Sequence, residues 1–189
     1  MAGRWNNLEL LGAGNLGSQT SVNANGMDHL IDVALGRYEI VCADLPGALD
    51  SVSEPILRAS NRIFLVTTNE IASLHMAAVR AKQLTERGLR EKIRLVFNRK
   101  VNRNKMREQE VQEAAGLPVS FALANDYAAV QTSILDATPM SIKGDLGQGL
   151  QALAKSLAVP QQKDAAPKRK FLEFFSIPNG AQTGTGWAR

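Results

Sequence analysis

The segment KIRLVFN at residues 92–98 decides the fold that this sequence predicts. Three other segments have the same character: YEIVCAD at 38–44, RIFLVTT at 62–68 and PVSFALA at 118–124. Their apolar residues follow one another almost without a break, as in strands that are covered on both faces. We therefore expect four buried strands, with Leu8–Leu11 as a weaker fifth.

Helical patterns fill the stretches between these strands. The clearest is Glu70–Arg87, after which Gly88 is a stop signal. The other candidates are Ala48–Ala59, Arg107–Ala115, Asp126–Ala137 and Asp145–Ala158. Strands that alternate with such helices predict an α/β protein with three layers and a mostly parallel sheet.

Two of these helices have apolar residues that share a face. In the first helix they are Ile71, Leu74, His75, Ala78 and Val79, and we expect this face, His75 included, to lie in the core. In the helix at 126–137 they are Tyr127, Val130, Ile134 and Ala137.

The composition is that of an ordinary globular protein. Of 189 residues 44% are hydrophobic and 21% charged, which excludes a disordered chain, and the net charge is +4. The single cysteine, Cys42, excludes an internal disulfide, and its place in an expected strand predicts an inert, buried thiol. No apolar run approaches the ~20 residues of a membrane-spanning helix. We expect a cytoplasmic protein.

The composition changes after Val159, which predicts two regions. Residues 1–159 form the α/β domain, and residues 160–189 form a basic linker and flexible tail with a short aromatic segment.

Polar residues follow the carboxyl ends of the strands, where ligands bind in open parallel sheets. Asp44 ends the first strand, and its carboxylate fits either a water-mediated Mg²⁺ site or the cap of a turn. Asn98 has the acceptor and donors that reading an adenine edge requires, although asparagine also commonly begins a loop. Asp126, which follows Asn125, could contact a ligand at this edge, and it fits equally well as the N-cap of the next helix.

The segments YEIVCADLPGALD, RIFLVTTNE, IRLVFNRKVNR and FALANDYAAVQTSI, in this order, resemble the second half of the MinD/ParA superfamily of P-loop ATPases. The resemblance covers roughly Trp5–Val159, and the CpaE-type proteins of pilus assembly are the most similar branch. It implies the family's α/β fold, ATP and Mg²⁺ as cofactors, and ATP hydrolysis by intact members.

The resemblance also implies roles for individual residues. Asp44 stands where the family steadies Mg²⁺ through a water, and Pro46 and Gly47 stand in the segment that senses the terminal phosphate. The residues that match the family's adenine-contacting positions are Asn98, Arg99, Asn125 and Asp126.

The family's phosphate-binding loop has no counterpart here, because no G-x-x-x-x-G-K-[ST] occurs in the sequence. We expect the chain to begin after that loop, so that the sheet lacks the strand that carries it and has open apolar edges. The sheet could close around the gap, a partner could supply the missing half, or the chain could be a truncated reading of a longer gene. We favour truncation, and we expect weak or absent ATP binding and no appreciable hydrolysis by this chain alone.

Two other functions remain open. The chain could be a non-enzymatic interaction module that keeps the fold without the phosphate loop. Gly12–Gly17 is also a formal G-x-G-x-x-G, with Asp32 twenty residues after Gly12, which suggests an NAD-binding oxidoreductase. That motif needs a helix at its third glycine, and we expect helical residues only from about Asp28, so a coincidental glycine-rich loop is the better interpretation.

We expect the chain to form a homodimer or to bind a partner protein. Two basic segments suggest further partners. Residues 87–107 contain nine Lys and Arg, which suggests nonspecific DNA binding, but a solvated loop and helix start is the better interpretation. The segment Lys168–Ile177 (KRKFLEFFSI) places basic residues beside an apolar cluster. It fits a weak anchor at the inner face of the plasma membrane, or a peptide that docks on a partner.

Overall fold

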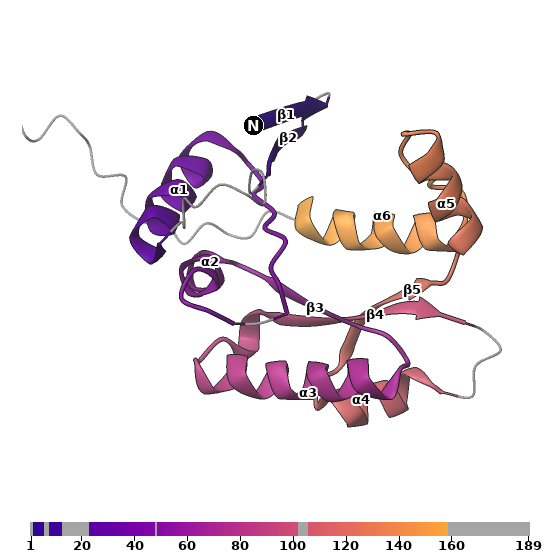
Figure 1. Cartoon of the computed structure of the whole chain (residues 1–189). Coiled ribbons are helices and arrows are strands. Elements are labelled where there is room, and N and C mark those ends of the chain that lie inside the picture. Colours follow the sequence, from indigo (N-terminus) through magenta and orange to yellow (C-terminus); the bar gives the residue numbers. More distant parts are fainter. Residues whose placement is uncertain (1, 6–7, 13–22, 48, 102–105, 159–189) are drawn as a thin grey trace, which may run out of the picture.

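A three-stranded parallel sheet lies at the centre of the computed structural model of this chain (Figure 1). Its strands are β3 (Ile63–Thr67), β4 (Ile93–Lys100) and β5 (Val119–Ala124), in the order β3-β4-β5. β4 pairs in parallel with both neighbours. These strands confirm the predictions at 62–68, 92–98 and 118–124.

The structure describes residues 2–5, 8–12, 23–47, 49–101 and 106–158. The predicted tail at 160–189 lies outside this part, as does most of the glycine motif that begins at Gly12.

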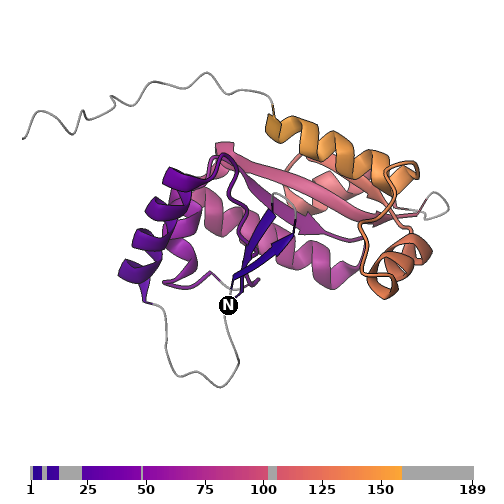
Figure 2. The same ribbon diagram turned by 90° about the horizontal axis from the view of Figure 1, so that it is seen from above.

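Helices cover both faces of the sheet, as the three-layer prediction requires (Figures 1 and 2). On one face lie α3 (Ile71–Glu86) and α4 (Glu108–Ala115). On the other lies α6 (Asp145–Ala158), which has the predicted bounds. The shorter elements are α2 (Ser53–Ala59), the 3-10 turn η1 (Arg90–Lys92) and α5 (Tyr127–Leu135). No helix in the described part is long and apolar enough to cross a membrane.

The N-terminal part of the chain lies on the same side of the sheet as α6 (Figure 1). It consists of the antiparallel strands β1 (Ala2–Trp5) and β2 (Leu8–Leu11), followed by α1 (Ala24–Arg37). Leu8–Leu11 is therefore a strand, as predicted, but it belongs to a separate hairpin. α1 begins four residues before the expected start, because the Asn23 side chain accepts a hydrogen bond from the Gly26 N–H at 2.8 Å.

The predicted strand Tyr38–Asp44 is wrong. These residues pair with no other strand in the described part of the chain, and Ile40 and Val41 are 59% and 43% exposed. A strand needs a neighbour for its backbone N–H and C=O groups, and an apolar sequence alone does not provide one. Cys42, predicted to be buried, is consequently exposed.

The larger part of the core lies between the sheet and the helices α3 and α4. The central residues of β4 point into both layers: Leu95, Val96 and Phe97 are each no more than 2% exposed. The buried residues of the α3 and α4 layer are Leu57, Leu74, Ala77, Ala81, Leu84, Leu89, Ile93, Leu95, Phe97, Val111, Ala115 and Leu117. On the opposite face, Val96, Leu123 and Leu146 form a smaller cluster beneath α6.

The packed faces of two helices differ from the predicted ones. α3 buries Leu74, Ala77, Ala81 and Leu84, whereas Ile71 is 83% exposed and His75 is exposed. Two of the four buried residues are alanines, whose small side chains let the helix approach the sheet closely. α5 buries no residue at all, and Tyr127 and Ile134 are both 73% exposed.

Glycines allow α6 to pack closely against its surroundings. A Cβ on Gly149 would lie 3.0 Å from Leu123 Cδ2 of β5. A Cβ on Gly147 would lie 2.6 Å from the Cα of Ile142 and still closer to the carbonyl oxygen of Ser141. Because both atoms belong to the backbone, they cannot move aside as a flexible side chain could.

The substitution Gly147→Ala is expected to lower the free energy of unfolding by about 1–3 kcal/mol through overpacking. Urea denaturation followed by circular dichroism measures this change. The matched control is Gly36→Ala in α1, where a Cβ meets nothing within 4 Å. Its better helix propensity should leave stability unchanged or raise it by about 0.5–1 kcal/mol. Equal effects at the two glycines would contradict the packing described for α6.

Asp50 organises the start of α2. Its Oδ1 accepts hydrogen bonds from the Ser53 N–H (2.8 Å), the Ser53 hydroxyl (2.9 Å) and the Val52 N–H (3.1 Å). The Asp50 N–H in turn donates to Ser53 Oγ at 2.8 Å. The hydrogen bonds from Ser53, foremost, lower the pKa of Asp50 below its usual 3.8.

This lowered pKa predicts a pH-dependent contribution to stability. A carboxylate with a depressed folded-state pKa stabilises the fold above its unfolded pKa, and the contribution disappears as the pH falls through the folded value. The stability difference between the wild type and Asp50→Asn should therefore be full above about pH 4 and shrink below it. Thermal melts from pH 6 down to pH 2.5 test this. A difference that is constant across the range would contradict it.

Candidate functional site

β4 ends in a β-bulge at Asn98 and Arg99. Phe97 lies opposite Ala122 and Lys100 opposite Ala124, so three steps along β4 match two along β5. Arg99 takes the extra place with φ 55°, a left-handed conformation that is uncommon for residues other than glycine. The Asn98 side chain accepts the Arg99 N–H through Oδ1 at 2.9 Å and so supports the bulge.

The bulge is joined to the end of β5. The Asn125 N–H donates to the Lys100 carbonyl oxygen at 2.9 Å, so the chain leaving β5 stays beside the chain leaving β4. Asp126 then caps α5, because its Oδ1 accepts the Ala129 N–H at 3.0 Å. The N-cap role that the sequence left open for Asp126 is therefore present. One edge of the sheet brings together Asn98, Arg99, Asn125 and Asp126.

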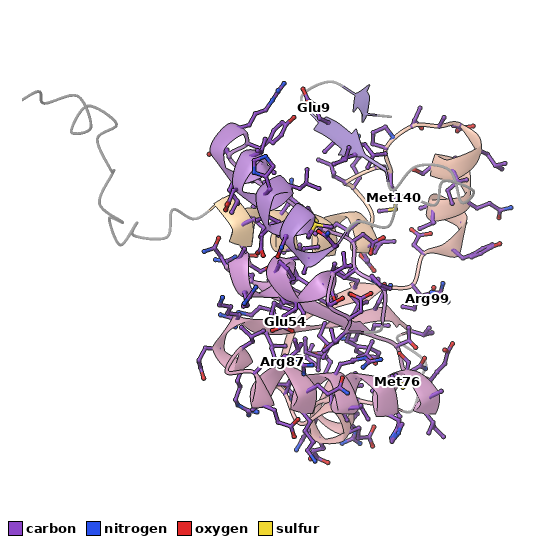
Figure 3. The ribbon with its side chains drawn as sticks, turned by 60° about the vertical axis from the view of Figure 1, so that its left-hand side comes forward. Glu9, Glu54, Met76, Arg87, Arg99 and Met140 are labelled. Atoms are coloured by element: carbon purple, nitrogen blue, oxygen red, sulfur yellow. The ribbon has the colours of Figure 1, made fainter. Side chains whose placement is uncertain are left out.

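The groups on this edge are accessible and partly uncommitted. Arg99 and Asn125 are exposed, and Asn98 and Asp126 are half-buried. The Asn98 NH₂ group donates to no other described residue. Arg99 makes no ion pair within the described part of the chain, in contrast to Arg87, whose Nε lies 3.2 Å from Glu54 Oε2 (Figure 3).

Hydroxyl groups order the loop after β3, at the same edge. Ser73 Oγ lies 3.1 Å from Thr67 Oγ1 and accepts the Thr68 N–H at 3.0 Å. The sequence analysis noted the polar end of this strand but missed Ser73. A hydroxyl in the first turn of the following helix is the only signal that could have indicated its role.

The residues predicted for the metal and phosphate side do not lie at the end of a described strand. Asp44, Pro46 and Gly47 are exposed and follow the segment that pairs with no strand. Leu45 and Leu49 on either side pack against the core, so the segment is attached to the domain. In the described part of the chain, no three His, Cys, Asp or Glu side chains gather as a metal site.

The basic run at 87–107 is divided by β4. Arg87, Arg90 and Lys92 precede the strand, whereas Lys100 and Arg107 lie at or after its end. Eight strand residues separate the two groups by about 25 Å. Four of the nine side chains also have partners: Arg87 pairs with Glu54, Lys100 pairs with Glu108, Lys92 Nζ donates to the Arg58 carbonyl oxygen, and Arg94 donates to the Glu91 and Ile93 carbonyl oxygens. Within the described part of the run, the basic residues before β4 are therefore separated from those at its end.

Comparison with known proteins shows similarity in structure. No family model and no curated protein matches the chain. A ParA family ATPase from Chlorobium tepidum TLS matches 71% of this chain with 57% of its own, at 22% identity and a TM-score of 0.66. The septum site-determining protein MinD of Pyrococcus horikoshii OT3, complexed with Mg-ADP, matches 71% of this chain at 19% identity and a TM-score of 0.59.

This chain has the fold of the ParA and MinD ATPases. The MinD of an Aquifex aeolicus MinC:MinD cell division complex is also similar, at 12% identity and a TM-score of 0.59, over 74% of this chain. The chain spans only 56–61% of the length of these three proteins. The similarity agrees with the fold that the sequence resemblance implied; the closer relation to CpaE-type proteins stays a prediction.

The left-handed conformation of Arg99 is expected to lower the free energy of unfolding. Arg99→Gly removes the clash of a Cβ in the left-handed conformation, and the free energy of unfolding should rise by up to ~1 kcal/mol. Arg90→Gly is the control, because Arg90 has no positive φ and should lose about 0.5–1 kcal/mol. Chemical denaturation compares the two, and a loss of equal size in both would exclude strain at Arg99.

Proposed function

We propose that this chain is the adenine-binding part of a ParA/MinD-type ATPase and that it binds ATP, weakly, at the edge formed by Asn98, Arg99, Asn125 and Asp126. The observation that carries the proposal is the bulge at Asn98. At the edge where ligands bind in open parallel sheets, the bulge holds Asn98 by its Oδ1 and leaves its NH₂ group without a partner among the described residues.

The chemistry of the four residues fits an adenine ring. An asparagine amide offers a donor and an acceptor side by side, as the edge of the base does. The Arg99 guanidinium is a planar cation that can lie against the face of a ring. The backbone link from Asn125 to Lys100 holds both sides of the edge at a fixed spacing.

ATP would bring Mg²⁺ with it, and the proposal assigns its protein contact to Asp44. Mg²⁺ commonly binds through one or two carboxylates, with phosphate and water oxygens as its other ligands. Pro46 and Gly47 would follow the terminal phosphate. These assignments rest on the sequence resemblance, because Asp44 lies on the segment that pairs with no strand.

We further propose that the protein acts in positioning or in pilus assembly, as CpaE-type ATPases do, in the cytoplasm or at the inner face of the plasma membrane. Its partner would be a second copy or another protein. The MinD of Aquifex aeolicus is known in complex with MinC, which supports a protein partner for this fold.

A non-enzymatic interaction module is the second candidate, and a specific observation favours it. Apolar side chains of the N-terminal part are exposed: Leu8, Leu10 and Leu11 are 60–67% exposed, and Ile40 is 59% exposed. Exposed apolar surface of this kind is typical of a protein interface. Binding of nucleotide distinguishes this candidate from the first.

The deciding experiment measures the affinity of the purified chain for a fluorescent ATP analogue, with and without Mg²⁺. We expect binding that requires Mg²⁺, and an affinity that falls about tenfold in Asn98→Ala, because the lost hydrogen bonds contribute roughly 1.5 kcal/mol. Asn61→Ala is the matched control, because Asn61 is exposed and lies just before β3, at the edge of the sheet opposite to the candidate site. Steady hydrolysis by the pure chain is not expected.

Two outcomes would contradict the proposal. If Asn98→Ala and Asn61→Ala bind the analogue equally well, the nucleotide lies elsewhere. If the folded wild-type chain binds no analogue with Mg²⁺ present, the interaction module is the better function. Circular dichroism of each sample establishes that the chain is folded.

A further inference from the structure

The face of the central sheet on which α6 lies is only partly covered. Val66 of β3 lies opposite Val96 of β4 on this face, and the two side chains differ sharply in exposure. Val96 is 2% exposed beneath α6, whereas Val66 is 56% exposed. Phe64 of β3, on the same face, packs against the cluster beneath α6, so β3 is open only toward its carboxyl end, at Val66.

The side of α6 next to this open surface is also apolar. The helix packs on β5 through Leu146, Gly149 and Leu153. A right-handed helix that crosses this sheet from the carboxyl edge to the amino edge turns the adjacent stripe toward β3. That stripe contains Leu150 and Leu157, which are 41% and 37% exposed.

The end of α6 is held beside β3. The Arg62 guanidinium, directly before β3, donates to the Ser156 carbonyl oxygen and lies 3.3 Å from Ser156 Oγ. This contact places a cation on the last turn of the helix, where the carbonyl groups carry partial negative charge. The described chain therefore ends next to the start of β3, and residues 159–189 follow in the sequence.

We propose that the aromatic segment Phe171–Ile177 of this chain covers the open face of β3, beside α6. Phe171, Phe174 and Phe175 are spaced so that a helix would place them on one side, with Glu173 on another. They would contact Val66 and the stripe of Leu150 and Leu157. The proposal is independent of nucleotide binding.

The length of the connection suits this arrangement. Twelve residues, 159–170, separate the end of α6 from Phe171 and reach up to about 40 Å when extended. The whole of α6 is about 21 Å long, so the aromatic segment reaches every part of β3 without strain. A segment tethered so closely has an effective concentration in the millimolar range, which favours its own chain over a second copy.

Hydrogen exchange of the full chain, followed by mass spectrometry, tests the proposal. The amides of 171–177 should exchange at least about tenfold more slowly than in a synthetic peptide of residues 168–177. Val66→Glu places a charge on the open face and should raise exchange to the rate of the free peptide. Ile71→Glu, at a position that is 83% exposed on α3, should leave the protection intact.

A second variant keeps the test valid if Val66→Glu fails to fold. The double substitution Phe174→Ser and Phe175→Ser lies outside the described domain and should abolish the protection without affecting the helices. Exchange of 171–177 at the free-peptide rate in the wild type overturns the proposal. So does protection that persists in Val66→Glu, that disappears on dilution as a dimer contact would, or that requires added anionic lipid vesicles.

Discussion

The structure depends on the parallel pairing of β4 with a strand on either side. This pairing satisfies the backbone of a strand whose centre, Leu95, Val96 and Phe97, is buried from solvent. The two helical layers pack against opposite faces of the same residues. Because both layers share β4, a change at its centre would disturb α3, α4 and α6 together.

The same strand places the candidate site. β4 is rigid where it pairs with β3 and β5, and it becomes irregular only at Asn98 and Arg99, where the bulge begins. A bulge at the end of a buried strand fixes the direction of a polar side chain more firmly than a free loop does. The left-handed conformation of Arg99 is the strain that accompanies this placement.

Sequence periodicity located the three strands of the central sheet and most helices. It succeeded because these elements pack against one another, so the apolar pattern that predicts each element also predicts its neighbours. It failed at Tyr38–Asp44, whose composition matches that of the confirmed strands but which pairs with no strand among the described residues. Pairing is a long-range property, so no local pattern could show its absence. The predicted face of α3 was wrong for another reason: it contained Ala78, whereas the structure buries Ala77 and Ala81. Because residues 77 and 78 are both alanine, residue type alone could not choose between them.

The candidate site, likewise, could be predicted from the sequence only in part. The sequence could predict Asn98, Arg99, Asn125 and Asp126 as neighbours because parallel strands end at one edge, and hydrogen bonds of the backbone join them there. It could not predict the position of Asp44, which depends on the pairing of the segment before it. The residues proposed to hold adenine are thus placed by the sheet itself, whereas Asp44, proposed to hold Mg²⁺, follows a segment that pairs with no strand in the described part of the chain. Under the proposed assignment, the geometry of the Mg²⁺ side therefore depends on how Tyr38–Asp44 is held, and not on the sheet that places the adenine side.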